Sequence, residues 1–341
     1  MIVSSAPGRC GIVGNPTDMY GGSVISCSTV ERARCTIMDA PSLTVSVSGF
    51  VQMLRSEEDL QLQGNYLDIP KAVLTYFELN PSNFKCRLSA GSDIPESAGL
   101  AGSTALVVAV VGAVLEKLGV EMDRFAIAET ARKVEYRIMG ITCGYQDQHM
   151  AAFGGLNYMD FRGKERLAQD ENEPLATVEP LQKTVGELPI VVAHTGIQRN
   201  SGVVHKSIRD RWMEGETAVV EGYRRIAELA WLGKKAILNR DWDSLGTLMN
   251  ENHQIQRALG GSGPQNDYLI DVCLDNGALG AKLAGAGQGG TIVALTTEPD
   301  RIVQALRSAG AKRIVWPRPV EGLAVEAAWQ QQLLQEYQFR G

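Results

Sequence analysis

Apolar and polar positions alternate along the first ninety residues in a way that predicts β-strands joined by polar turns. Turn-forming residues are densest in the loop Asn15–Gly22, which separates the first two predicted strands. The pattern predicts strands near residues 11–14, 24–27, 36–38, 43–49 and 84–89, and a helix near residues 71–79.

The segment Pro95–Leu115 is the most informative part of the chain. Three small residues precede a helix so apolar that it must be buried, and we expect Ser103 to cap that helix and Gly119 to end it. A glycine-rich turn before a helix N-terminus presents unpaired N–H groups and the positive end of the helix dipole, which suits an oligophosphate. The segment is neither a Walker A loop nor a dinucleotide fingerprint. A capped core helix behind a tight turn is the alternative that this segment alone leaves open.

A second helix is predicted from Asp123 to Met139. A helical wheel places Glu135 on a face of small and apolar residues, with Glu129 pointing away from it. A carboxylate on such a face is costly unless it meets a cation or a metal. The alternative is a glutamate at the edge of the face that reaches solvent or an arginine.

The second half of the chain predicts a separate α+β unit. The polar run Ala168–Pro174 is the best candidate for a linker. Beyond it the order of predicted elements is strand, helices, strand, strand, helix, strand, which is typical of an α+β domain. Because a single core rarely grows beyond about 250–300 residues, we expect an N-terminal domain over residues 1–170 and a C-terminal domain over 175–341.

Composition narrows the class of protein. The 341 residues are 44% hydrophobic and 21% charged with a net charge of −6, which argues against a surface that binds nucleic acid. The six cysteines form no Cys-x-x-Cys pair, so we expect reduced core thiols and no zinc site. Neither a signal-peptide h-region nor a run of about 20 apolar residues occurs. We therefore expect a cytoplasmic protein without a membrane partner, and a homodimer is compatible with the sequence.

Three glycine-bearing loops follow one another along the chain, at Ala6–Asp18, Pro95–Ala105 and Lys282–Gly290. Together with Gln146–Gln148 they resemble the GHMP kinases, the family of galactokinase, homoserine kinase, mevalonate kinase and phosphomevalonate kinase. The resemblance covers nearly the whole chain in the same order. It implies an α+β, two-domain GHMP kinase fold, with an N-terminal domain like ribosomal protein S5 domain 2 and a ferredoxin-like C-terminal domain. ATP and the acceptor would lie between the two.

The resemblance also implies roles for particular residues. The second motif departs from the family at Thr104, where a small residue or Ser is usual, and Gln288 lies within the third loop. By resemblance, the catalytic pair is Asp147 and Arg9, Mg²⁺ is held by Ser103 and Glu135, and the acceptor is bound by Asn15, Asp18, Gly285 and Gly287. The ATP phosphates are bound by Pro95, Gly99, Leu100, Ala101, Gly102, Ser103 and Thr104.

These groups would meet the physical needs of phosphoryl transfer, which are charge neutralisation, in-line positioning and an acceptor for the hydroxyl proton. We interpret Asp147 as a group that orients the hydroxyl and accepts its proton late. In the loose transition state of phosphoryl transfer, the bond to the nucleophile is only weakly formed, so a strong base is not needed. We therefore expect an ATP- and Mg²⁺-dependent kinase acting on a sugar or sugar acid.

Within the family the likeness is greatest to the glucuronokinase branch, at Gly14–Asp18, Gly99–Ala105, Leu156–Phe161 and Ser201–Trp212. This resemblance implies phosphorylation of glucuronate to glucuronate 1-phosphate. Heptose-phosphate kinases share the pattern over residues 146–155 and are the nearest alternative. An isoprenoid alcohol kinase is more distant, and an inactive ligand sensor is the alternative outside the enzymes. The acceptor carboxylate needs a cation, and the candidates are His205, Lys206, Arg209 and Arg211.

Overall fold

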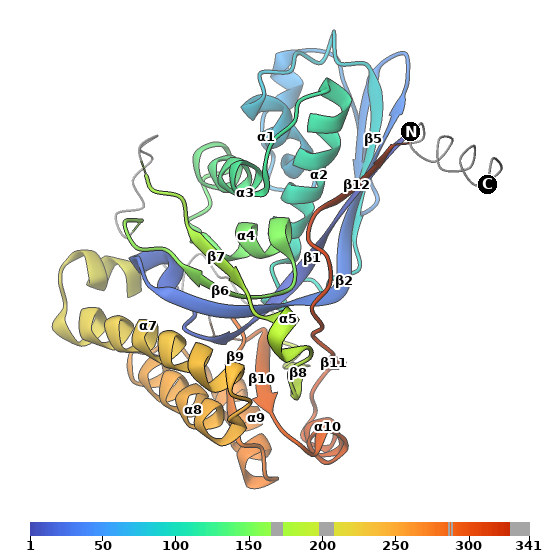
Figure 1. Ribbon diagram of the computed structural model, residues 1–341. Helices are drawn as coiled ribbons and strands as arrows, with labels where there is room; N and C mark the ends of the chain where they lie inside the picture. Colours follow the sequence, from blue (N-terminus) through green and yellow to red (C-terminus); the bar gives the residue numbers. More distant parts are fainter. Residues whose placement is uncertain (165–172, 198–207, 286, 288, 328–341) are drawn as a thin grey trace, which may run out of the picture.

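The computed structural model describes residues 1–164, 173–197, 208–285, 287 and 289–327. Its strands form two separate sheets, one of eight strands and one of four. Helices cover both sheets, and the two parts lie one above the other in Figure 1. The predicted α+β class is therefore confirmed.

The larger sheet contains the N-terminal part of the chain. Its strands run in the order β12-β1-β2-β5-β3-β4, with β6 paired to β2 and β7 paired to β6. All pairs are antiparallel except β3 with β5. The strands are β1 (Ile2–Val13), β2 (Ser23–Asp39), β3 (Leu43–Val47), β4 (Phe50–Leu54), β5 (Cys86–Ser92), β6 (Leu156–Asp160), β7 (Thr177–Pro180) and β12 (Ala324–Ala327).

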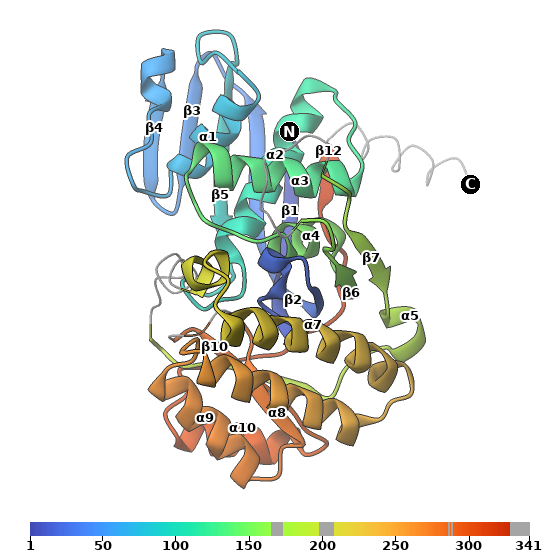
Figure 2. The ribbon, with the colours of Figure 1, turned by 90° about the vertical axis from the view of Figure 1, so that its left-hand side faces the viewer.

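Helix α2 (Gly102–Leu118) lies across β1 and β2 and fills the centre of the first core. Its residues 104–115 are all buried, as its continuous apolar run predicts. Helices α1 (Asp68–Tyr76), α3 (Arg124–Lys133) and α4 (Gln146–Phe153) surround it (Figures 1 and 2). Short helical turns occur at η1 (Thr17–Tyr20) and η2 (Glu57–Leu60).

The predicted helix from Asp123 to Met139 is confirmed in extent but changes its winding. The Asp123 side chain accepts a hydrogen bond from the backbone N–H of Ala126 at 2.8 Å and so caps α3. After Lys133 the chain continues as a π-helical turn, η3 (Val134–Ile138), which carries Glu135. Such turns often occur at functional sites.

The smaller sheet has the order β11-β8-β10-β9 and is antiparallel throughout. Alternate residues of β8 face opposite sides, so Val191 and Ala193 pack against α9 and α10 while Ile190 and Val192 join the first core. The strands are β8 (Ile190–His194), β9 (Gly280–Leu283), β10 (Thr291–Leu295) and β11 (Arg313–Val315). The helices of this part are α5 (Gln182–Val185), α7 (Thr217–Leu238), α8 (Trp242–Ala258), α9 (Pro264–Asp275) and α10 (Pro299–Ser308), with α7 and α8 side by side in Figure 2.

The division into residues 1–170 and 175–341 stays a proposal, and the strand pairing refines it. Strands β7 and β12 follow the proposed linker, yet both belong to the first sheet.

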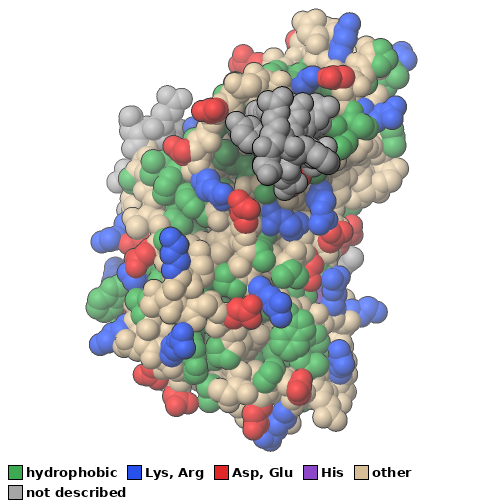
Figure 3. Space-filling model, turned by 45° about the vertical axis from the view of Figure 1, so that its right-hand side comes forward, with side chains coloured by type: hydrophobic (Ala, Val, Ile, Leu, Met, Phe, Trp, Pro, Cys, Tyr) green, Lys and Arg blue, Asp and Glu red, His purple; other side chains and the backbone are tan. Residues whose placement is uncertain are grey.

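None of the described helices is both long and apolar enough to cross a bilayer. All six cysteines are free thiols, and only Cys143 is not fully buried. Acidic and basic side chains are interspersed on the face shown in Figure 3.

Candidate active site

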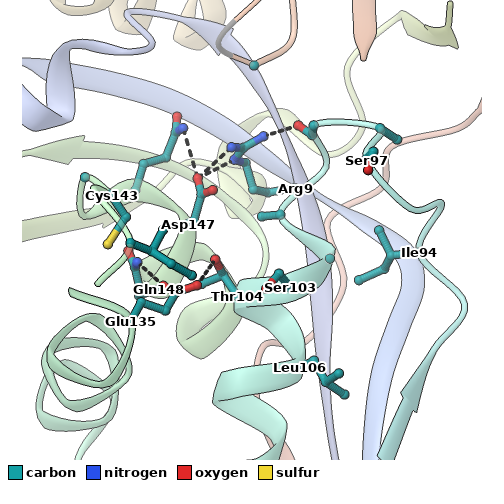
Figure 4. A pocket seen from close by; sticks show the side chains of 18 of the residues that line it. Arg9, Ile94, Ser97, Ser103, Thr104, Leu106, Glu135, Cys143, Asp147 and Gln148 are labelled. Carbon is teal, nitrogen blue, oxygen red and sulfur yellow. Dashed lines mark hydrogen bonds and ion pairs between the residues drawn. The ribbon is translucent and has the colours of Figure 1, made fainter. Parts of the chain in front are cut away.

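A cavity of about 580 Å³ lies where the N-terminus of α2, the N-terminus of α4 and the first and third glycine loops meet. Figure 4 shows its central side chains, several of them joined by hydrogen bonds and ion pairs. Its wall includes twelve of the fourteen residues expected in the site. These are Arg9, Asn15, Asp18, Pro95, Gly99, Ala101, Gly102, Ser103, Thr104, Glu135, Asp147 and Gly285, while Leu100 and Gly287 do not line it.

The glycine loop before α2 ends differently from our expectation. The helix begins at Gly102, and Ala101 before it takes a left-handed conformation with a φ of 59° and no side-chain cap. The prediction that Ser103 caps α2 is therefore wrong. Because the turn is made by the backbone at Ala101, the Ser103 side chain is exposed on the cavity wall, where it can meet a ligand. The first N–H groups of a helix have no partner within it.

Arg9 on β1 connects this loop to α4. Its Nε and Nη2 atoms lie 2.7 Å and 2.6 Å from Oδ1 of Asp147, and its Nη1 donates to the carbonyl of Gly99 at 2.6 Å. The Arg9 backbone N–H donates to the carbonyl of Leu100 at 3.0 Å. Leu100 is buried, and its carbonyl connects the loop to β1. The Arg9 side chain is 5% exposed and that of Asp147 is 30% exposed, so the guanidinium is held while the carboxylate still faces the cavity.

Glu135 is buried, as the helical wheel predicts, and each of its oxygens accepts a hydrogen bond. Thr104 donates to Oε1 at 2.7 Å, and Gln148 Nε2 donates to Oε2 at 2.5 Å (Figure 4). Burial raises the pKa of Glu135 to about 7, although the two hydrogen bonds act in the opposite direction. The departure at Thr104 therefore supplies a direct contact to the carboxylate.

The residues around Glu135 fit a magnesium ion that shares its coordination with phosphates. Mg²⁺ prefers oxygen ligands and is usually held by one or two protein groups together with water and substrate phosphates. Ser103 and Glu135 offer such oxygens on the cavity wall. Oε1 of Gln148 is buried and has no hydrogen-bond partner, so a further acceptor oxygen lies beside the carboxylate. Among the described residues, no group of three or more His, Cys, Asp or Glu side chains that could hold a metal ion occurs.

Glu129 lies away from Glu135, as expected, but not in solvent. Its Oε1 lies 2.8 Å from the ammonium of Lys164, and the side chains of this pair are 17% and 1% exposed. Replacing Glu129 should therefore affect the stability of the fold, because a buried lysine would lose a carboxylate partner.

Asn15 and Lys282 join the first glycine loop to the third. The Lys282 ammonium is fully buried and donates to Oδ1 of Asn15 at 2.7 Å, while Nδ2 of Asn15 donates to the carbonyl of Gly285 at 3.2 Å. No described carboxylate forms an ion pair with Lys282, and burial lowers its pKa to about 7. Gly287 lies close to Gly261, because a Cβ built on Gly287 would lie 1.7 Å from the carbonyl oxygen of Gly261. Gln288 lies outside the described residues.

Asp18 lines the cavity and also contacts α4. Its Oδ2 accepts hydrogen bonds from the backbone N–H groups of Tyr145 at 2.9 Å and Gln146 at 3.0 Å. Burial raises the pKa of Asp18, and the Gln146 N–H acts in the opposite direction.

The candidate cations for an acidic acceptor have different surroundings. Arg211 forms two hydrogen bonds of 2.7 Å to Glu216 and one of 2.8 Å to the carbonyl of Leu259, so it is engaged in the fold. Arg209 has no ion pair with the described residues. His205 and Lys206 lie outside the described part of the chain.

Two residues escaped the sequence reasoning as members of the site. Gln148 stands directly after Asp147, and Lys282 opens the third glycine loop, so both lie inside motifs that we recognised. The sequence did not show that these two side chains are buried, because neither lies on an apolar helix face that would have predicted burial.

Glycine loops at helix N-termini bind phosphates, and phosphoryl transfer needs a carboxylate that orients the acceptor hydroxyl. The cavity contains both features, which is the arrangement expected of a nucleotide-dependent phosphotransferase. Comparison with known families agrees. Residues 68–155 match the GHMP kinases N terminal domain, and residues 234–312 match the GHMP kinases C terminal domain. The chain belongs to the GHMP kinase family and is an ATP-dependent phosphotransferase.

Three curated relatives align with almost the whole chain. Mevalonate kinase of Pyrococcus furiosus is 29% identical, covering 95% of this chain and 98% of the relative. D-glycero-alpha-D-manno-heptose 7-phosphate kinase of Campylobacter jejuni is 28% identical, covering 90% and 93%. Glucuronokinase 1 of Arabidopsis thaliana is 27% identical, covering 92% and 90%. Such similar identities do not separate the three acceptors.

Solved structures support the fold. Galactokinase of Lactococcus lactis, complexed with galactose, aligns with a TM-score of 0.75 at 18% identity over 95% of each chain. Mevalonate kinase of Methanococcus jannaschii aligns with a TM-score of 0.74 at 19% identity, over 94% of this chain and 98% of that one. The predicted two-domain GHMP kinase fold is confirmed.

Proposed function

We propose that this kinase transfers the γ-phosphate of ATP to a hydroxyl of a sugar or sugar acid with the help of Mg²⁺, and that glucuronate is the preferred acceptor. The observation that carries the proposal is the position of Asp147. Arg9 holds this carboxylate between the Gly99–Thr104 loop and the loop that carries Asn15 and Asp18.

In this proposal the N–H groups at the start of α2 bind the phosphates, and Ser103 and Glu135 hold the cation. The cation would neutralise charge that develops on the phosphates. Asp147 orients the acceptor hydroxyl and accepts its proton as the oxygen–phosphorus bond forms. The Arg9 guanidinium keeps the carboxylate directed into the cavity, which is the positioning that phosphoryl transfer needs most.

A polar acceptor is supported by four polar residues of the cavity wall, which are Asn15, Asp18, Gln146 and Asp147. Similarity to glucuronokinase supports a sugar acid. Arg209 is then the candidate cation that remains for its carboxylate among the described residues, because Arg211 is engaged by Glu216. The second candidate, a heptose-phosphate kinase, is favoured by the similarity to the Campylobacter relative.

The proposal is tested with the purified chain, ATP, Mg²⁺ and a panel of glucuronate, glucose, heptose phosphates and mevalonate. We expect kcat/KM for glucuronate to exceed that for glucose by about 30-fold or more, because an unpaired buried carboxylate costs about 2–4 kcal/mol. Replacing Arg209 by Gln should reduce this preference. Transfer only to a phosphorylated sugar, or only to mevalonate, would contradict glucuronate as the acceptor and identify the other substrate instead. Nucleotide binding without transfer to any acceptor would indicate a ligand sensor.

A cytoplasmic location, a homodimer and the absence of nucleic-acid partners stay predictions from the sequence.

A further inference from the structure

Helix α4 carries Asp147 in its first turn but has no cap from its own chain neighbours. The helix begins at Gln146, and the side chain of Tyr145, which precedes it, makes no capping hydrogen bond. A helix of eight residues is marginal by itself, so its first turn depends on outside partners. The position of Asp147 therefore depends on whatever holds that turn.

Asp18 supplies the missing cap from 127 positions earlier in the chain. One oxygen, Oδ2, accepts both the Tyr145 and the Gln146 N–H groups, at 2.9 Å and 3.0 Å. A carboxylate at this end also meets the positive end of the helix dipole. The contact is thus a charged cap, and it connects η1 to α4.

Gly144 shows how closely the two segments approach. A Cβ built on Gly144 would lie 2.0 Å from Oδ2 of Asp18, so any side chain there would displace the carboxylate. No described residue donates a hydrogen bond to the other oxygen, Oδ1, and the Asp18 side chain lines the cavity. One oxygen therefore serves the helix, while the other is available to a ligand.

We infer that Asp18 is a positioning residue that links the acceptor loop to the N-terminus of α4 and so fixes Asp147 relative to the acceptor. Oδ2 holds the first turn of the helix, and Oδ1 binds a hydroxyl of the acceptor. The second part rests on the proposed function, whereas the first part does not. Binding of the acceptor and placement of the catalytic carboxylate are then coupled through one side chain.

The first test measures the helix without any acceptor. Amide hydrogen exchange of the segment 143–153 should be about tenfold faster in Asp18→Ala than in the wild type, since a lost cap costs about 1–2 kcal/mol. Asp18→Asn keeps an oxygen for the two N–H groups and should restore most of the protection. Asp241→Ala is the matched control, because Asp241 caps α8 through Ser244 N–H at 3.0 Å, far from the cavity. It should leave exchange in 143–153 unchanged.

The second test uses the acceptor that the substrate panel identifies. We expect Asp18→Ala to lower kcat by roughly tenfold to a hundredfold, because a small displacement of a catalytic group has that effect. Gly144→Ala should lower kcat similarly, because its Cβ would displace the same carboxylate. Asp18→Asn should recover much of kcat while its KM for the acceptor stays raised.

The two tests separate the inference from the proposed function. Wild-type exchange in 143–153 of Asp18→Ala, or wild-type kcat in Gly144→Ala, would overturn the positioning role. Faster exchange without any sugar kinase activity would support the cap and reject the acceptor instead.

Discussion

Arg9 and Asp147 meet through a single carboxylate oxygen. Both guanidinium nitrogens that reach Asp147 lie within 2.7 Å of Oδ1, and no described residue donates to Oδ2. The aspartate is therefore held at one oxygen and open to a ligand at the other. A side chain arranged in this way can keep its orientation while it accepts a proton.

This arrangement predicts that Asp147→Asn lowers kcat by a factor on the order of 10² or more, because the change removes a group that acts in the transition state. Binding of an ATP analogue, measured by calorimetry, should stay close to that of the wild type. Comparable kcat with both substrates saturating would show that Asp147 is not the catalytic aspartate.

Arg9→Met should lower kcat by roughly tenfold to a hundredfold while nucleotide affinity changes less. The Arg9 backbone N–H would still hold the carbonyl of Leu100, so the phosphate loop keeps one of its supports. Arg9→Lys should recover only part of the activity, because an ammonium cannot reproduce the forked contacts to Asp147 and Gly99. Steady-state kinetics and calorimetry on the same preparations check this. Equal losses in kcat and nucleotide affinity would assign Arg9 to the loop alone.

Glu135→Gln should raise the Mg²⁺ concentration needed for half-maximal activity, since the cation loses a charged ligand. Binding of Mn²⁺ in the presence of an ATP analogue, followed by electron paramagnetic resonance, should weaken in parallel. Glu129→Gln is the matched control on the same helical segment. It should lower the melting temperature, because Lys164 loses one of its two carboxylate partners, but leave the Mg²⁺ requirement unchanged. A raised Mg²⁺ requirement in Glu129→Gln but not in Glu135→Gln would show that Glu129, and not Glu135, is the metal ligand.

Lys282 should make stability depend on pH above neutrality. Its pKa is about 7 in the folded state and 10.5 when unfolded, so between these values the unfolded chain binds more protons. The free energy of unfolding of the wild type should therefore rise from pH 7 to pH 9 relative to Lys282→Met, by about 2–3 kcal/mol.

The titratable groups near Lys282 have pKa values outside the range from pH 7 to pH 9. Burial raises the pKa of Cys10 to about 12 and lowers that of His253. Urea unfolding at pH 7, 8 and 9 measures the difference. Parallel stability profiles for the wild type and Lys282→Met would contradict the lowered pKa.

Patterns with a period were the easiest to interpret from the sequence. The buried helix after the glycine loop and the placement of Glu135 on a covered face both followed from the spacing of small and apolar residues. The start of α2 was missed because Ala101 takes a positive φ, which is uncommon outside glycine and has no sequence signal here.

Contacts between distant segments could not be predicted in the same way. The wheel separated Glu129 from Glu135 correctly, but it could not show that Lys164 lies against Glu129. Lys282 and Asn15 are 267 positions apart, and Asp18 reaches Tyr145 over 127. Local pattern contains no information about such pairs, so the capping role of Asp18 emerged only from the folded structure.

Strand β12 pairs residues Ala324–Ala327 with Ile2–Ser5 of β1, which otherwise lies at the edge of the sheet. During synthesis the beginning of the chain leaves the ribosome hundreds of residues before its partner strand. The N-terminal sheet is therefore incomplete until residues Ala324–Ala327 have been made, and by then every strand of the smaller sheet is already available.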